Sequence, residues 1–137
     1  MTLFDIITKN KNLKDIQSSL AEVKNDIKNL PCIDINKLLM LHNIKVELIK
    51  DSKNFNGLIF LSSYETKTRT INLYLQEIDS LKKKLTDKNT DLEKIAIAHE
   101  LYHAIFDKKE PSEVKESKAV IFSLLLNDLD PLKEISF

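Results

Sequence analysis

The chain of 137 residues has very little of three residue types that many functional sites require. Cys32 is its only cysteine, which excludes an intramolecular disulfide and a cysteine-rich zinc knuckle. Gly57 is its only glycine, which excludes P-loops, dinucleotide-binding fingerprints and the nucleophile elbow of serine hydrolases. Arg69 is its only arginine, so the bidentate fork that reads phosphates and guanine edges is almost absent.

Surplus charge and long apolar segments are missing as well. Lys and Arg number 21, as do Asp and Glu, and a net charge of zero argues against a protein that coats a nucleic-acid backbone. The longest apolar run, residues 119–126, is interrupted by Ser123, whereas a transmembrane helix needs about 20 apolar residues. Asp5 interrupts the first apolar stretch, so the start of the chain is unlike a signal peptide. We therefore expect a cytoplasmic protein that binds neither membranes nor nucleic acid directly.

Hydrophobic patterning over the first part of the chain predicts a helix followed by a small helix and a sheet. A stripe with alternating spacings of three and four predicts an N-terminal helix within residues 1–30, formed by Leu13, Ile16, Leu20, Val23, Ile27 and Leu30. This stripe packs either on the chain's own core or in a coiled-coil dimer. Over residues 31–76, Asp34 is the expected N-cap of a short helix, and strands are expected near 44–48, 58–61 and 71–75.

The second part of the chain is expected to be helical. Residues 76–91 are charged and predict a solvated excursion with one or two helical turns at most. Residues 92–106 are apolar around most of a helical circumference, which is typical of a buried helix. Pro111 restarts the chain, and a final helix is expected from 112 to 126. The sequence thus predicts one α+β domain over residues 1–137, mainly helical, with a small three-stranded, largely antiparallel sheet packed on the buried helix.

The buried helix carries the pattern H-E-x-x-H at His99, Glu100 and His103. Histidines four residues apart stand one turn above each other on one helix face, where both imidazoles can bind one zinc ion. Glu100 lies about 100° around the helix from His99, beside the metal, where a general base for the attacking water is needed. The alternative is a pair of hydrogen-bonded core histidines without a metal. His42 is a lone histidine near the start of a strand and is expected to lie outside the site.

A catalytic zinc site also needs a third protein ligand, and the sequence offers Asp107, Glu110, Glu113 and Glu116. Asp107 lies one turn further along the same helix, too far past the metal, and Glu110 lies in the turn. Glu116 is favoured because slim side chains continue its helix face and allow close helix packing: Ala119, Val120 and Ser123. Glu113 remains the rival, although a glutamate in a first turn also suits the helix dipole.

Together these two helices resemble those of the ImmA/IrrE zinc metallopeptidases. That family pairs an AHELGH-like helix with a second helix of the form E-x-x-A-N-x-F-A-x-x-L-L-x-P, and here Ala98, Glu116, Ala119 and Phe122 match. The segment from Pro31 to the strand near 44–48 also resembles the family, so the likeness covers about residues 30–127. The departures include Tyr102 for glycine, Lys118 for an acidic residue and Val120 for asparagine. None of them removes an expected ligand.

The resemblance implies a minimal, gluzincin-like metallopeptidase domain, with residues 92–127 as its zinc-binding helix pair. It implies one Zn²⁺ per chain, held by His99, His103 and Glu116, with Glu100 as the catalytic base. It further implies a site-specific endopeptidase that cleaves a helix-turn-helix repressor of a phage or mobile element, encoded nearby. The alternatives are a metal-stabilised anti-repressor that sequesters its partner uncut, and a metal-free helical protein.

Residues 70–75 alternate cleanly and predict a sheet edge that holds an extended substrate by strand addition. Arg69 and the lysines at 82–84 flank this segment and suit an acidic or polar partner face. The expected substrate-binding residues are Leu73, Tyr74 and Tyr102. Tyr64, Tyr74 and Tyr102 are the candidates for oxyanion stabilisation, although each is also a typical packing residue.

Overall fold

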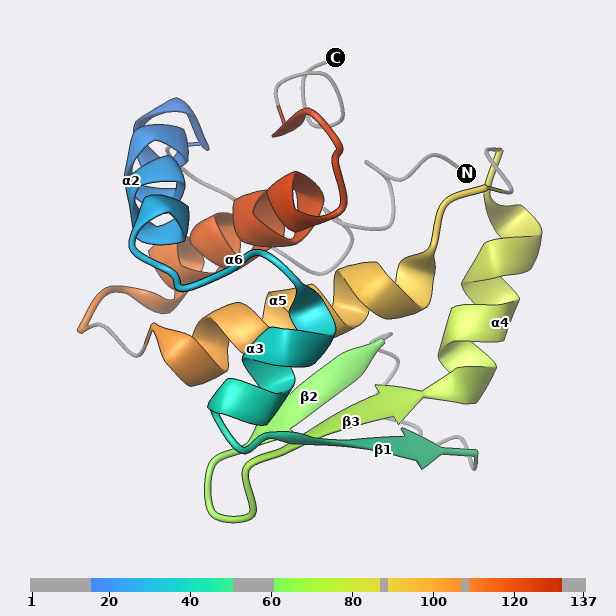
Figure 1. The fold of residues 1–137 in the computed structure, drawn as a ribbon. Helices are drawn as coiled ribbons and strands as arrows, with labels where there is room; N and C mark the ends of the chain where they lie inside the picture. The colour runs from blue at the N-terminus through green and yellow to red at the C-terminus, as the bar shows by residue number, and fades with distance from the viewer. Residues whose placement is uncertain (1–15, 51–60, 87–88, 107–108, 132–137) are drawn as a thin grey trace.

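The computed structural model of the chain describes residues 16–50, 61–86, 89–106 and 109–131. It confirms an α+β fold with a three-stranded sheet and a helical majority (Figure 1). The elements in chain order are α2 (Ile16–Lys28), α3 (Ile35–Leu41), β1 (Lys45–Ile49), β2 (Ser62–Glu65), β3 (Thr70–Tyr74), α4 (Leu75–Lys84), α5 (Leu92–Ile105) and α6 (Ser112–Leu126). Leu13, Asp107 and most of the strand expected at 58–61 lie outside the described residues.

The sheet is mixed, so the expectation of a largely antiparallel sheet is wrong. Its strand order is β1-β3-β2, with β1 parallel and β2 antiparallel to β3. Strand β2 lies on the other side of β3 and runs in the opposite direction (Figure 1). Strand β3 therefore begins at the end of the sheet where β1 begins, and the two strands are parallel. The first predicted strand, near 44–48, corresponds to the outer strand β1, whose apolar residue Leu48 is exposed.

The central position of β3 overturns the prediction that residues 70–75 form an open edge. Both backbone edges of β3 are already paired, with Lys45–Ile49 on one side and Ser62–Glu65 on the other. All five residues of β3 are buried, including Asn72 and Tyr74, so both faces of this strand are covered. Substrate therefore cannot add to β3 by backbone pairing.

Two other segments differ from the sequence-based expectation. Strand β2 lies in the polar stretch 62–67, between the strands expected near 58–61 and 71–75, where the hydrophobic pattern predicts no strand. The charged segment 76–91 includes most of α4, a ten-residue helix whose Ile78 and Leu81 enter the core. The hydrophobic pattern does not predict β2 or the full length of α4, because β2 has few apolar residues and α4 has only a narrow apolar stripe.

Helix α5 lies between the sheet and α6 (Figure 1). It begins at Leu92, the first residue of the predicted buried helix. Asp91 is the N-cap residue, and its side chain accepts a hydrogen bond from the backbone N–H of Lys94. On its sheet side, Ile95 and Leu101 join Ile71 and Leu73 of β3 in one hydrophobic core. Helix α6 covers the opposite side, and its bounds agree with the prediction. Packing on both sides explains why α5 is apolar around most of its circumference.

The N-terminal stripe packs within the chain. Val23 of α2 is fully buried beside Ile121 and Phe122 of α6, and Leu20 and Ile27 lie against the same cluster. This contact agrees with the first of the two alternatives for the stripe. None of the helices in the described part of the chain has the length and apolar character needed to cross a membrane.

Candidate metal centre

The two histidines of α5 lie on one face, as their spacing predicts. Their rings contact each other edge to face, with centroids 5.1 Å apart and an interplanar angle of 66°. Both are largely removed from water, because the His99 side chain is 10% exposed and the His103 side chain 23% exposed. Partial exposure leaves this face open to a small ligand or a substrate.

Helix α6 brings Glu116 to the same point. Its Oε2 lies 3.0 Å from Nε2 of His99, and its Oε1 lies 3.1 Å from Nε2 of His103. The close approach is possible because the face of α6 that follows Glu116 carries Ala119 and Val120, both buried against neighbouring elements. Three donor atoms, two imidazole nitrogens and one carboxylate oxygen, lie within 4.8 Å of one another.

The donor set fits a divalent metal. The Nε2 atom of His103 is buried and makes no hydrogen bond with the described residues, although a carboxylate oxygen of Glu116 is near. A buried polar atom without a partner is costly, and a metal ion would satisfy it. Two donors on one tetrahedral zinc lie about 3.3 Å apart, close to the separations found here. The structure therefore assembles a candidate metal triad of His99, His103 and Glu116.

Glu100 lies outside this triad, as the helical geometry predicts. Its carboxylate is buried, and its Oε2 accepts a hydrogen bond of 2.8 Å from Oγ of Ser62 in β2. The same hydroxyl lies 3.3 Å from the carbonyl oxygen of Ala96, one turn earlier in α5. The two glutamates of the site thus have different partners, since Glu116 contacts the histidines and Glu100 contacts the sheet.

The other candidate ligands that lie among the described residues do not join the triad. Glu113 is in the first turn of α6, and its backbone carbonyl accepts a hydrogen bond from Ser117. The Glu110 carboxylate pairs with Lys118. His42 is the C-cap residue of α3, and its carbonyl oxygen accepts hydrogen bonds from the Arg69 guanidinium. Among the described residues, Glu116 is the acidic side chain that reaches both histidines.

The residues expected to bind substrate have structural surroundings instead. Leu73 is 2% exposed in the core between the sheet and α5. Tyr74 is buried, and its hydroxyl lies 2.8 Å from Oγ of Ser63. The Tyr102 ring packs against Phe106 and Phe122, which removes it from any surface where a substrate could bind. The expectation that Leu73 and Tyr102 contact substrate is therefore wrong, because neither side chain reaches the surface.

The Tyr102 hydroxyl is engaged as well as buried. It donates a hydrogen bond of 3.3 Å to Asp26 of α2. Burial, together with the negative charge of Asp26, raises the pKa of Tyr102 well above its ordinary value. Tyr102 therefore ties α5 to α2 through its hydroxyl, and its ring lies nearly perpendicular to the His103 ring, with centroids 6.4 Å apart.

An ion cluster around Lys118 could not have been predicted from the sequence. This lysine is almost completely buried in α6 and pairs with Glu22 of α2 and Glu110. Burial alone would lower the pKa of Lys118, but the hydrogen bonds that its ammonium group donates to both carboxylates outweigh burial and raise the pKa. Glu22 and Lys118 are 96 positions apart, so no local pattern in the sequence signals their contact.

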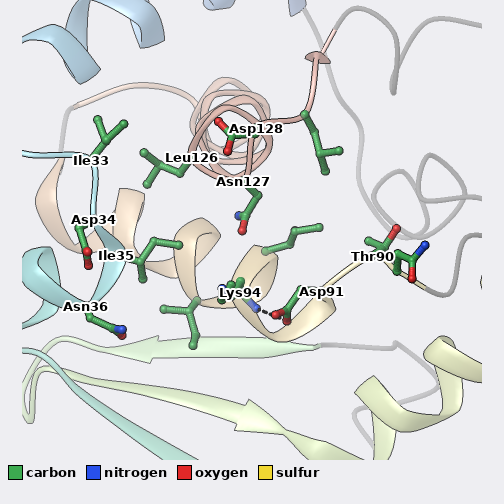
Figure 2. A pocket seen from close by; sticks show the side chains of 14 residues that line it. Ile33, Asp34, Ile35, Asn36, Thr90, Asp91, Lys94, Leu126, Asn127 and Asp128 are labelled. Carbon is green, nitrogen blue, oxygen red and sulfur yellow. Dashed lines mark hydrogen bonds between the residues drawn. The ribbon is translucent and has the colours of Figure 1, made fainter.

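A separate cavity of about 510 Å³ opens where the start of α3, the start of α5 and the end of α6 meet (Figure 2). Its lining contains none of the triad residues, nor Glu100. Two of its acidic side chains, Asp34 and Asp91, already accept hydrogen bonds from the backbones of α3 and α5 as N-caps. The metal triad therefore lies outside this cavity.

Comparison of the chain with protein-family models, curated proteins and solved structures gives no match. The function of the chain is therefore inferred from its residues and from their geometry.

Proposed function

We propose that the chain is a zinc-dependent endopeptidase whose site is His99, Glu100, His103 and Glu116. The observation that carries the proposal is the convergence of two histidines and a glutamate from α5 and α6, with a second glutamate, Glu100, directly after His99 in α5. Core histidines without a metal would need hydrogen-bond partners, yet Nε2 of His103 makes no hydrogen bond with the described residues. The resemblance of both helices to ImmA/IrrE metallopeptidases supports the same reading.

Zinc is the metal that this donor set favours. Two imidazoles and one carboxylate make up the His₂Glu set of catalytic zinc sites, in which the fourth position stays open. A zinc ion bound there would supply Lewis-acid chemistry, lowering the pKa of water toward about 7 and polarising the scissile carbonyl. A closed structural site would instead need four protein ligands, and the described residues bring three together.

The chain's own residues would handle the proton and orient the ligands. Glu100 carries a carboxylate next to the triad without belonging to it, which suits a general base that takes a proton from the attacking water. The same carboxyl group can then give that proton to the leaving amine. Glu116 lies against both imidazoles, where it would complete the metal-ligand set, and it needs no role in proton transfer.

The sheet offers one edge that is well placed for an extended peptide. Strand β2 is an outer strand of the sheet and packs against α5, the helix that carries Glu100. We assign strand addition to β2, in place of the central strand β3, because an edge strand keeps unpaired backbone groups for a substrate. The resemblance points to a helix-turn-helix repressor as the protein substrate, cleaved in an exposed or locally unfolded segment.

The proposal is tested with zinc-loaded protein and the repressors encoded beside its gene, analysed by gel and by mass spectrometry of the fragments. We expect one discrete cut that is abolished by EDTA and restored by zinc. Glu100→Gln should keep the zinc and reduce cleavage by at least about 10²-fold. A repressor that binds tightly but stays intact with both proteins would support the anti-repressor alternative and contradict the proposal.

A further inference from the structure

The geometry around β2 assigns a role to Ser62, a residue that no sequence pattern marks. Ser62 and Tyr64 lie on the sheet face that packs on α5, because their register partners Leu73 and Ile71 are part of the core beneath that helix. Ser63 points to the opposite face, where its Oγ contacts the Tyr74 hydroxyl. The two neighbouring serines of β2 therefore face different surroundings.

The Ser62 hydroxyl reaches Glu100 directly. Its Oγ donates to Oε2 of Glu100 at 2.8 Å, which is a normal length for a hydrogen bond from a hydroxyl group. Among the described residues, Ser62 is the hydrogen-bond partner of this buried carboxylate. Without that bond the Glu100 side chain would be free to rotate, since glutamate has several flexible torsions.

The bond also separates the two carboxylates of the site. Glu116 lies against both imidazoles, whereas Glu100 is held toward the sheet by a residue of another element. A glutamate released from the sheet could turn toward the metal and compete with water for the open position. We propose that Ser62 is a positioning residue that holds the Glu100 carboxylate in the orientation of a base and keeps it off the metal. This inference rests on the proposed function.

The test compares steady-state cleavage by the zinc-loaded protein and three matched variants. Ser62→Ala should lower kcat by about ten- to a hundred-fold with little change in KM, because a misplaced catalytic group slows chemistry more than binding. Ser62→Thr keeps the hydroxyl on a strand-compatible side chain and should recover most of the rate. Ser80→Ala, at an exposed position of α4 outside the proposed site, should cleave like the wild type. Each variant should still bind one zinc per chain in equilibrium dialysis.

A second arm separates positioning from a general loss of structure. If Ser62 acts through Glu100, adding Ser62→Ala to Glu100→Gln should not reduce the residual rate further. Multiplicative losses, or a Ser62→Ala variant with the wild-type kcat, would overturn the assignment.

Thermal unfolding provides a readout that does not need activity. The shifts in Tm caused by Ser62→Ala and Glu100→Gln should be non-additive, because the two side chains share one hydrogen bond. Additive shifts would overturn the positioning role even if the chain cleaves protein. If the wild type cleaves nothing while the shifts are non-additive, the proposed function fails and the Ser62–Glu100 contact stands.

Discussion

At the residue scale, the site separates two glutamates by their partners. Glu116 contacts His99 and His103, and Glu100 receives its hydrogen bond from Ser62. The spacing of the H-E-x-x-H pattern predicted the placement of the three α5 residues, since a helix fixes neighbours three and four apart. Ser62 could not be predicted, because its contact with Glu100 depends on how the sheet packs on α5.

The choice of Glu116 over Glu113 gives the first prediction. Glu116→Ala removes the carboxylate between the histidines, so this variant should lose the single zinc ion per chain that we expect the wild type to bind. Glu113→Ala removes a first-turn glutamate outside the triad and should keep the zinc. Equilibrium dialysis followed by metal analysis measures both. The opposite ranking would refute the assignment of Glu116.

The second prediction concerns Tyr102, whose hydroxyl donates to Asp26 while its ring lies nearly perpendicular to the His103 ring, with centroids 6.4 Å apart. Tyr102→Phe keeps the ring in its aromatic cluster but removes the hydrogen bond to a buried carboxylate. We expect the free energy of unfolding to fall by about 1–2 kcal/mol, with zinc binding unchanged, as measured by urea denaturation and dialysis. Tyr64→Phe is the matched control, since the Tyr64 hydroxyl makes no hydrogen bond with the described residues. A loss of zinc from Tyr102→Phe would contradict this account.

At the scale of elements, the long apolar helices were predictable and the polar elements were not. The bounds of α6 follow from Pro111 and an apolar run, and α5 from the change of composition at Leu92. Strand β2 and helix α4 were missed because tertiary packing stabilises segments with weak local patterns. The parallel pairing of β1 with β3 has no local signal at all, since it depends on the path of the chain between them.

The packing of α2 on α6 gives a third prediction. Val23→Ala removes two buried methyl groups between these helices and should lower the free energy of unfolding by about 1–2 kcal/mol. Lys24→Ala, at the exposed neighbouring position, should have little effect. Because the contact is made within one chain, the loss should be the same at every protein concentration in urea denaturation. A loss that disappears as concentration rises would indicate a coiled-coil dimer instead.

At the scale of the whole molecule, other elements pack on both sides of α5 and α6, the two helices that carry the candidate metal triad. The sheet packs beneath α5, and α2 covers α6 through apolar contacts and through the ion cluster of Lys118 with Glu22 and Glu110 (Figure 1). Both sets of contacts join segments that are far apart in the sequence. The position of Glu116 relative to α5 therefore depends on the complete fold and not on either helix alone.

Lys118→Met gives the fourth prediction, which tests the ion cluster that Lys118 forms with Glu22 and Glu110. Methionine fills much of the same volume, but it leaves Glu110, which is mostly buried, without its cation. We expect the free energy of unfolding to fall by about 1–3 kcal/mol, less than for a fully buried pair because Glu22 is 59% exposed and stays hydrated. Glu22→Gln should cost less than Glu110→Gln for the same reason. Equal stability of Lys118→Met and the wild type would show that the cluster contributes nothing net.

The central claim is that these elements form a metal-dependent peptidase with Glu100 as its base. The most direct measurement incubates zinc-loaded wild type and zinc-loaded Glu100→Gln with one mixture of native cellular proteins and maps new peptide termini by mass spectrometry. The account predicts discrete new termini with the wild type that are absent with Glu100→Gln, although both proteins carry one zinc. Identical termini from the two proteins, or none from a fully zinc-loaded wild type, would contradict it.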